Sequence, residues 1–327
     1  MPLGFNVNQP MRILITGGSG FIGGRLASLL SMHEHEVTVA TRNIDTHKEW
    51  FERINTVDIS WSETFDFETF CHGYDVIIHA AGMNSRDSAS NPGGASSFNG
   101  LATERLVKAA AKTGVKRFVY LSTAHVYSDP LIGEINEKTK PKNHHPYATS
   151  HLQGERAILR TFEVSKMNGT VIRLSNVFGV PINSKVNCWE LLVNNVCKQV
   201  VEIQKIHLNS TENQNRDFIT MTDACRVISF VATQDLSMEF PNLLNVGSEQ
   251  TRSTLEVVKL VQSRALHKFG SLPSLQDLQN QEASSALNLN FRSIHRKLYA
   301  DKILNDIESE IDDLLEYCSK TFGKRLS

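Results

Sequence analysis

The sequence predicts an α/β fold, a doubly wound parallel sheet with a smaller C-terminal α/β lobe. An apolar run at 11–16 leads directly into a glycine-rich turn, and up to about residue 180 short apolar runs alternate with longer helical patterns. Such alternation is typical of a parallel sheet that is covered by helices on both faces. After residue 180 the alternation loosens. We therefore expect a leader at 1–10, the sheet domain at 11–180 and a lobe formed mainly by 181–327, with the chain crossing between the two parts.

The individual elements follow from the spacing of the apolar residues. Short apolar runs bounded by glycine or polar residues are expected to form strands, at 11–16, 36–41, 54–58, 75–80, 117–122 and 170–175. Apolar residues that recur every three or four positions indicate helices, at 21–32, 99–113 and 147–166. In the C-terminal part we expect helices near 187–199, 253–268 and 302–322, and strands near 202–208 and 242–246. The polar segment 271–290 is expected to be a loop.

Composition excludes several classes of function. The 327 residues carry a formal net charge of −1, without the basic excess that nucleic-acid binding uses. The sequence has no apolar run of the length that spans a bilayer, and residues 1–10 lack the charged and apolar regions of a secretory signal. The five cysteines are scattered and lack CxxC spacing, so we expect a reduced, cytoplasmic protein without a metal site.

The glycine-rich turn indicates a nucleotide cofactor site. Gly17 permits a tight turn, Gly20 lets the backbone approach a pyrophosphate, and Gly23 lets the following helix pack closely on the strand. Phe21 and Ile22 begin that helix, whose first N–H groups and partial positive charge attract an anion. A glycine-rich turn without a ligand is the alternative interpretation. The preceding strand and the following apolar helix favour the cofactor site.

Several motifs in a fixed order resemble the extended short-chain dehydrogenase/reductase family, which includes the sugar-nucleotide epimerases and dehydratases. The motifs are TGGSGFIG at 16–23, DVIIHAAG at 75–82, NGLATERL at 99–106, KRFVYLSTAHVY at 116–127, YATSH at 147–151, VIRLSNVFG at 171–179 and RDFITMTD at 216–223. The resemblance covers about residues 11–262. It implies an NAD(P)-binding Rossmann domain at 11–180, a mainly substrate-binding lobe after it, and a homodimer formed through the helices at 99–113 and 147–166.

The resemblance also assigns cofactor contacts beyond the glycine loop. Ala80, Ala81 and Gly82 match the strand end that lies along the cofactor, and Asn99 matches the start of the following helix. Asp58 and the adjacent Ile59 match the positions that contact the adenine.

The end of the second strand bears on the choice between NAD(H) and NADP(H). Thr41 stands where NAD-dependent enzymes typically carry an acidic residue for the ribose 2′-hydroxyl, and Arg42 follows it. A guanidinium pairs well with a 2′-phosphate. The sequence therefore favours NADP(H). The alternative is a surface arginine beside an NAD(H) site.

Three positions are expected to carry the chemistry. By the resemblance, Thr123 polarises the substrate oxygen and Tyr147 exchanges a proton with it. The family has a lysine four residues after the tyrosine, which binds the nicotinamide ribose and lowers the pKa of the tyrosine. In this sequence that position is His151.

The histidine affects oxidation more than reduction. A tyrosine with its ordinary pKa near ~10 is about one part in a thousand ionised at pH 7, and a neutral histidine supplies no charge to change that. Oxidation needs Tyr147 as a base, whereas reduction needs it protonated. We therefore predict a ketone reductase, with His151 as a contact to the ribose. A protein that binds its ligands without turnover is the alternative interpretation of His151.

Substrate contacts are expected at Ser85, Thr123, His125, Asn176 and Arg216. Asn176 and Arg216 match positions that contact the diphosphate of a nucleotide sugar, and a planar guanidinium suits a phosphate. Ser85 is proposed from its position alone. His125 is interpreted either as a substrate contact and substitute acid or as a packed histidine.

Two further points complete the sequence prediction for this site. Arg216 is either a phosphate contact or the partner of Asp217 or Asp223 in an ion pair. The two residues after Thr123 are not acidic, which makes elimination of water by the dehydratase mechanism an unfavoured reaction.

The overall prediction is an NADP-preferring oxidoreductase that reduces a keto group on a nucleotide-linked or similar polyhydroxylated substrate. A nucleotide-sugar epimerase, a reductase of a non-sugar ketone and a cofactor-binding regulatory subunit are the alternatives.

Overall fold

A computed structural model describes residues 10–44, 54–207, 214–238, 240–276 and 288–323. Its largest element is a seven-stranded sheet in which every neighbouring pair of strands is parallel. The strand order across this sheet is β11 (Leu243–Val246), β7 (Asn168–Leu174), β5 (Arg117–Thr123), β4 (Val76–His79), β1 (Arg12–Thr16), β2 (Glu36–Thr41) and β3 (Asn55–Asp58). The order reverses direction next to β1, so the doubly wound α/β fold is confirmed.

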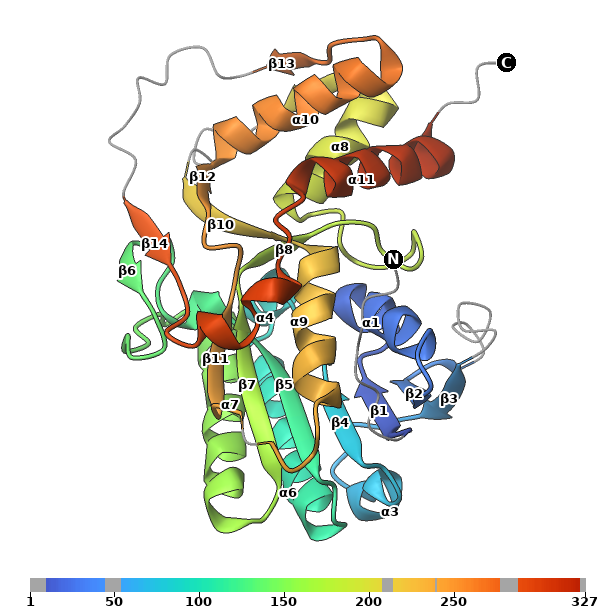
Figure 1. The fold of residues 1–327 in the computed structure, drawn as a ribbon, viewed down its shortest axis with the longest axis vertical. Helices are drawn as coiled ribbons and strands as arrows, with labels where there is room; N and C mark the ends of the chain where they lie inside the picture. Colours follow the sequence, from blue (N-terminus) through green and yellow to red (C-terminus); the bar gives the residue numbers. More distant parts are fainter. Residues whose placement is uncertain (1–9, 45–53, 208–213, 239, 277–287, 324–327) are drawn as a thin grey trace.

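Helices cover both faces of this sheet (Figure 1). One face packs against α1 (Phe21–Ser31) and α9 (Met221–Thr233), and the other packs against α3 (Phe67–Cys71), α6 (Thr103–Lys112) and α7 (Pro146–Val164). The strands between these layers are apolar on both sides; in β5, for example, all seven residues are buried. Two continuous hydrophobic cores therefore hold the sheet rigid between the two helical layers.

A second system of strands and helices, the small system, lies beyond the carboxyl ends of the strands of the large sheet. A three-stranded sheet contains β12 (Thr251–Ser253), β10 (Asn215–Thr220) and β8 (Asn176–Phe178). The helices α8 (Leu192–Ile203), α10 (Thr254–Phe269) and α11 (Ile307–Phe322) pack together next to it around their own apolar core (Figure 1). Two parallel strand pairs complete this part, β9 (Lys205–His207) with β13 (Ser274–Gln276) and β6 (Gly133–Ile135) with β14 (Leu289–Phe291).

The chain passes between the two systems more than once. After β10 it returns through α9 and β11 to the seven-stranded sheet, where β11 pairs with β7. The division at residue 180 therefore stays a prediction about where each function lies, because α9 and β11 lie with the large sheet. Of the expected leader, residues 1–9 lie outside the described part of the chain.

The structure refines several element boundaries. Helix 99–113 is preceded by α5 (Pro92–Ala95) and begins as a π-helical segment, η2 (Ser96–Ala102), before α6. The last helix starts at Ile307 because the Asp306 side chain accepts the N–H of Ser309 and caps it. The segment 271–290 is not all loop, since β13 and the start of β14 lie in it, although residues 277–287 lie outside the described part.

Short elements connect the two systems at the carboxyl edge of the large sheet. α4 (Ser85–Ser90) follows β4, and the 3₁₀ turn η3 (Ala124–Val126) follows β5. Two more 3₁₀ turns, η5 (Arg296–Leu298) and η6 (Ala300–Lys302), precede α11. Because parallel strands end at the same edge, the residues after β1, β4, β5 and β7 come together there, where ligands bind in folds of this type.

Candidate active site

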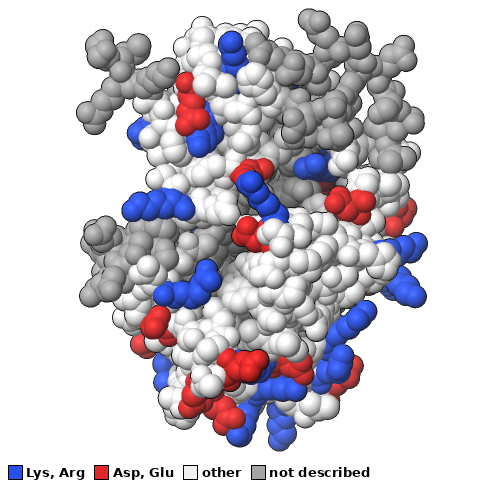
Figure 2. All heavy atoms as spheres, turned by 180° about the vertical axis from the view of Figure 1, so that it is seen from behind, with Lys and Arg blue, Asp and Glu red and all other residues white. Residues whose placement is uncertain are grey.

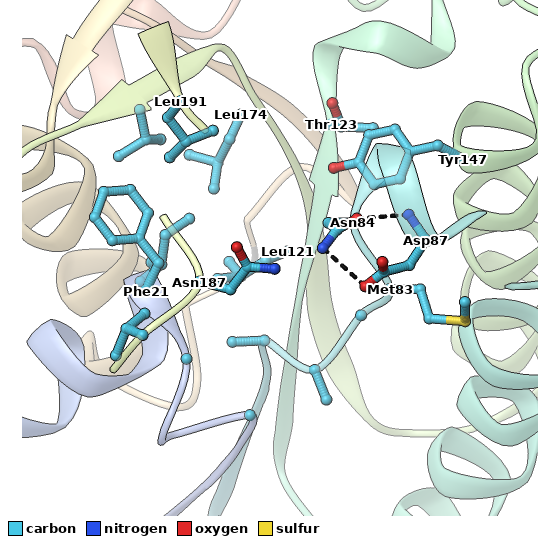
Figure 3. A pocket seen from close by; sticks show the side chains of 18 of the residues that line it. Phe21, Met83, Asn84, Asp87, Leu121, Thr123, Tyr147, Leu174, Asn187 and Leu191 are labelled. Carbon is cyan, nitrogen blue, oxygen red and sulfur yellow. Dashed lines mark hydrogen bonds between the residues drawn. The ribbon is translucent and has the colours of Figure 1, made fainter. Parts of the chain in front are cut away.

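A cavity of about 1170 Å³ lies between the two layer systems, at the carboxyl ends of the central strands. The close-up shows apolar side chains of Phe21, Leu174 and Leu191 on one side of it and polar groups from Thr123 and Tyr147 on another (Figure 3). The volume exceeds that of a typical site for a single small ligand. Most of the residues predicted for cofactor and substrate line it: Gly17, Gly20, Phe21, Ile22, Arg42, Ile59, Ala80, Ala81, Gly82, Thr123, His125, Tyr147, His151, Asn176 and Arg216.

The glycine loop forms a cradle that side chains would fill. Gly17 has a φ of +71°, and a Cβ atom placed on it would lie 2.5 Å from the Ala81 nitrogen. A Cβ atom on Gly23 would lie 2.3 Å from the Gly17 carbonyl oxygen, so Gly23 supports the loop from behind and does not itself line the cavity. At the start of α1, no side chain caps the helix at Gly20, which leaves the N-terminus open to the cavity. The loop therefore fits a pyrophosphate.

The far end of the cavity, beyond β2 and β3, suits the adenosine part of a dinucleotide. Arg42 is exposed and lines this end together with Thr41 and Ser19, whose hydroxyl oxygens lie 3.4 Å apart. Ile59 is buried and lines the cavity, whereas Asp58 is exposed at the end of β3 and is not among the lining residues. Arg42 and Ile59 thus line the cavity, and their cofactor contacts stay predictions, while Asp58 is not among the lining residues.

Asn99 acts behind the cavity wall. It is buried in η2; its side-chain oxygen accepts the Met83 N–H at 2.8 Å, and its amide group donates to the Ser150 hydroxyl at 3.0 Å. The two bonds join the turn after β4 to α7. Asn99 thus holds the Ala80–Gly82 segment in place, and Gly82 itself faces the cavity.

Thr123 and Tyr147 meet at the centre of the cavity. Thr123 ends β5, and Tyr147 lies in the first turn of α7, with the two hydroxyl ends close together in the close-up (Figure 3). Burial raises the pKa of Tyr147 above its ordinary value of 10, and a hydrogen bond with the Thr123 side chain opposes that rise in part. Tyr147 therefore holds its proton at neutral pH. A substrate carbonyl between these two groups would meet two hydrogen-bond donors.

His151 lies one helical turn after Tyr147, and its ring meets the tyrosine ring edge-on with centroids 4.7 Å apart. The side chain is buried, with 5% of its surface exposed, and burial lowers its pKa to about 4. His151 is therefore neutral at pH 7, as the sequence analysis assumed. It supplies no positive charge to Tyr147.

The substrate end of the cavity carries His125, Asn176 and Arg216. The side chains of His125 and Asn176 interact, and burial lowers the pKa of His125 from its ordinary value, with Asp129 acting in the opposite direction. The predicted alternative for Arg216 was an ion pair with Asp217 or Asp223. The Asp217 carboxylate instead accepts two hydrogen bonds from Ser248, and Asp223 pairs with Arg226. Both carboxylates thus have other partners, and Arg216 lines the cavity.

Several lining residues escaped the sequence analysis. Ser85, predicted as a sugar contact, is the exposed first residue of α4 and does not line the cavity, whereas its neighbours Asn84 and Asp87 do. The Asn84 amide donates to the Asp87 carboxylate at 3.0 Å (Figure 3). Asn84 is the N-cap of α4, and the Asn-x-x-Asp spacing is a helix-start signal that would have placed both residues next to the end of β4.

The loop between β8 and α8 closes the substrate end. Lys185, Asn187 and Glu190 from this loop line the cavity, and Glu190 forms an ion pair with Arg86 on α4. The sequence of this loop has no periodic spacing of apolar residues and no capping motif, so no local pattern predicts that the loop lies at the cavity. Its contribution depends on the packing of α8 against the rest of the small system.

On the face drawn in Figure 2, the lysine and arginine side chains of the described residues are interspersed with acidic ones. None of the helices in the described ranges is long and apolar enough to cross a membrane. Within the same ranges, no group of three or more histidine, cysteine or acidic side chains is arranged to hold a metal ion.

Comparison with known proteins shows which of them this chain is similar to. Among characterised relatives, the UDP-N-acetyl-alpha-D-glucosaminuronate decarboxylase of Bacillus cytotoxicus is 26% identical over 265 residues, which cover 76% of this chain and 78% of that protein. The dTDP-6-deoxy-L-talose 4-dehydrogenase (NAD(P)(+)) of Kitasatospora kifunensis is 26% identical over 262 residues, covering 77% and 78%. The UDP-glucose 4-epimerase structure from Thermotoga maritima superposes with a TM-score of 0.79 at 18% identity, covering 95% of this chain and 99% of that one.

The family itself is identified by a family model that matches most of the chain. The model of the NAD dependent epimerase/dehydratase family matches residues 13–247, well over half of the chain. Members of this family are NAD-dependent enzymes, and the ordered motifs that resembled the extended short-chain dehydrogenase/reductases lie within or next to the matched region. The chain therefore belongs to the NAD-dependent epimerase/dehydratase family.

Proposed function

We propose that the protein is an NADPH-dependent reductase that converts a keto group on a nucleotide-linked or similar polyhydroxylated sugar into an alcohol. The observation that carries this direction is the protonated Tyr147 beside a neutral His151. Burial raises the pKa of Tyr147, and no lysine charge follows it on α7 to lower that pKa. A reductase uses the tyrosine as an acid, which is its resting state here, whereas an alcohol oxidation needs the tyrosinate.

Each residue of the centre has one role in this reaction. When bound, NADPH supplies a hydride to the carbonyl carbon. Thr123 donates a hydrogen bond to the carbonyl oxygen, and Tyr147 gives its hydroxyl proton to the same oxygen as the C=O bond becomes a C–OH group. The tyrosinate then takes a proton from solvent through the open cavity. The balance is one ketone, one NADPH and one proton consumed for one alcohol and one NADP⁺ formed.

The substrate class rests on the residues at the other end of the cavity. Arg216 and Lys185 offer two cations to a diphosphate, and His125 and Asn176 offer hydrogen-bonding groups beside them. The names of relatives that act on UDP- and dTDP-linked sugars support the same class. We propose a nucleotide-linked keto sugar as the substrate.

The proposal is tested by following nicotinamide absorbance with a panel of nucleotide-linked 4-keto sugars. We expect consumption of NADPH in a one-to-one ratio with alcohol formed. Conversion of a nucleotide sugar to its epimer without net consumption of NADPH would show an epimerase instead. Tight cofactor binding with no conversion of any sugar would show a regulatory or binding protein.

Cofactor preference gives a separate prediction at Arg42. We expect Arg42→Ala to weaken NADPH binding about tenfold or more, because a charge-assisted hydrogen bond to a phosphate is worth about 1.5–3 kcal/mol. NADH has no 2′-phosphate, so its dissociation constant should change little. Titration of the cofactor fluorescence with both nucleotides measures the two effects. An equal loss for both nucleotides would contradict the proposed NADP(H) preference and leave NAD(H) as the cofactor.

Two wider properties remain proposals. We propose a homodimer formed through α6 and α7, which pack against each other; the support is analogy with family members, and light scattering on the purified protein tests it. All five cysteines are free and buried, which supports a reducing compartment such as the cytoplasm. Localisation of the tagged protein in its own cells would test this.

A further inference from the structure

Tyr120 is a buried tyrosine that the reaction above does not use. It lies in β5, has no exposed surface and does not line the cavity. Its hydroxyl oxygen lies 2.9 Å from Nδ1 of His151, so it contacts the residue that replaces the family's lysine. The pair joins β5 to α7.

The chemistry of this contact determines which ring nitrogen of His151 carries the proton. Burial raises the pKa of Tyr120 well above its ordinary value of 10, so the hydroxyl keeps its proton. His151 is the one hydrogen-bond partner found for that hydroxyl among the described residues. If Nδ1 donated, the tyrosine proton would be buried without an acceptor, which is costly. Tyr120 therefore donates to Nδ1, and the neutral ring carries its proton on Nε2.

The protonated nitrogen faces the cofactor side of the cavity. A Cβ atom placed on Gly82 would lie 3.5 Å from Nε2 and 3.4 Å from Cε1 of His151, so this edge of the ring lies against Gly82. Both residues line the cavity, and Nε2 makes no hydrogen bond to any residue that the structure describes. An N–H group is thus presented where the cofactor passes Gly82.

The surroundings hold Tyr120 in this orientation. His79 is its partner on β4, and the two rings stack with centroids 5.4 Å apart and planes at 26°. His79 is in turn held between the hydroxyls of Thr16 at 2.6 Å and Thr103 at 2.8 Å. On the helix side, a Cβ atom on Gly154 would come within 3.1 Å of the Tyr120 hydroxyl, so the glycine gives that hydroxyl room against α7.

We propose that Tyr120 is a positioning residue that fixes His151 as an Nε2–H donor to the nicotinamide ribose. The inference rests on the proposed role of His151 as a cofactor contact. It explains how the site functions without the lysine. The pair reproduces the hydrogen bond that a lysine gives to the ribose but not its charge, so cofactor positioning is kept while the pKa of Tyr147 stays high.

The test is the tautomer of His151 in the cofactor-free protein, measured by ¹⁵N NMR on histidine-labelled samples. The His151 signals are assigned by their loss in His151→Gln. We expect an unprotonated Nδ1 and a protonated Nε2 in the natural protein, and a mixture of the two tautomers in Tyr120→Phe. The same variant should bind NADPH about fivefold more weakly, the effect of one poorly oriented hydrogen bond.

Tyr299→Phe is the matched control. Tyr299 is also a buried tyrosine whose hydroxyl donates one hydrogen bond, to the Asn245 carbonyl oxygen at 2.6 Å, but it lies away from the cavity. We expect it to leave the His151 signals and NADPH affinity unchanged. A protonated Nδ1 in the natural protein would overturn the inference without any variant, as would unchanged NADPH binding in Tyr120→Phe. Failure of every keto sugar to react would count against the proposed reductase and leave the tautomer result standing.

Discussion

Tyr147→Phe should lower kcat for keto-sugar reduction by about 10²–10⁴, the usual contribution of a positioned general acid. The substitution removes only the hydroxyl that donates the proton. The ring remains, and with it the edge-on contact with His151 at 4.7 Å, so the dissociation constant for NADPH should change little. Single-turnover measurement of NADPH consumption gives the chemical step, and fluorescence titration gives the affinity.

The pH dependence of the same reaction follows from the sign of the pKa shift. A general acid works while it is protonated, and burial raises the pKa of Tyr147 above 10, so the reduction rate should stay level from pH 7 to about pH 9. His151, with its pKa lowered to about 4, is neutral throughout that range and adds no inflection to the pH profile.

The control for Tyr147→Phe is Tyr74→Phe. Tyr74 is a partly buried tyrosine that does not line the cavity, so this variant should keep full activity. Retention of more than a tenth of kcat in Tyr147→Phe would assign the acid to another group.

The second large effect concerns stability and the buried ion pair of Glu155 and Arg173. Glu155 is 1% and Arg173 5% exposed, and two nitrogens of the guanidinium donate to the carboxylate oxygens at 2.5–3.2 Å. The Ser122 hydroxyl donates to the same carboxylate at 2.5 Å. Although burial alone would lower the pKa of Arg173, the hydrogen bonds and charge of Glu155 raise it above the ordinary value. The pair links α7 to β5 and β7 below the cavity.

Glu155→Gln is expected to lower the free energy of unfolding by about 3–5 kcal/mol, because it leaves the arginine charge buried without a counter-charge. Urea unfolding followed by ellipticity measures it. Replacing both partners by methionine should cost much less, since no charge is then left in the interior. The exposed pair of Glu68 and Lys112 provides the control, and Glu68→Gln should change stability by about 0–1 kcal/mol. A double variant as unstable as Glu155→Gln would show that packing, not the unpaired charge, sets the loss.

Local sequence patterns predicted the sheet correctly, and the family motifs predicted the centre of the site. The glycine loop, Thr123 at the end of a strand and Tyr147 at the start of a helix each belong to one strand–turn–helix unit. In a parallel sheet the end of a strand and the start of the helix that follows it lie at the same edge, so these residues are expected to meet there. The departure at His151 was visible for the same reason, because it lies one turn after Tyr147 on the same helix.

Local patterns were insufficient where a position depends on how separate units pack. Ser85 is predicted from its position alone, but the way α4 starts after β4 puts Asn84 and Asp87 at the cavity, while Ser85 is not among the lining residues. The loop carrying Lys185 and Glu190 has no periodic signal, and α8 brings it to the substrate end. Which side chains line the cavity at such places depends on packing across the whole fold rather than on neighbouring residues in the chain.

The sequence by itself therefore determined the family and the doubly wound sheet, and its resemblance to that family predicted the cofactor loop and the proposed catalytic pair Thr123 and Tyr147. Only the tertiary structure decided which group His151 contacts in the interior. Its partner Tyr120 lies 31 positions earlier, on a different element, and the contact exists because β5 and α7 pack together over Gly154. The proton on His151 depends on that buried contact, since a hydroxyl enclosed by the fold must donate to the acceptor within its reach.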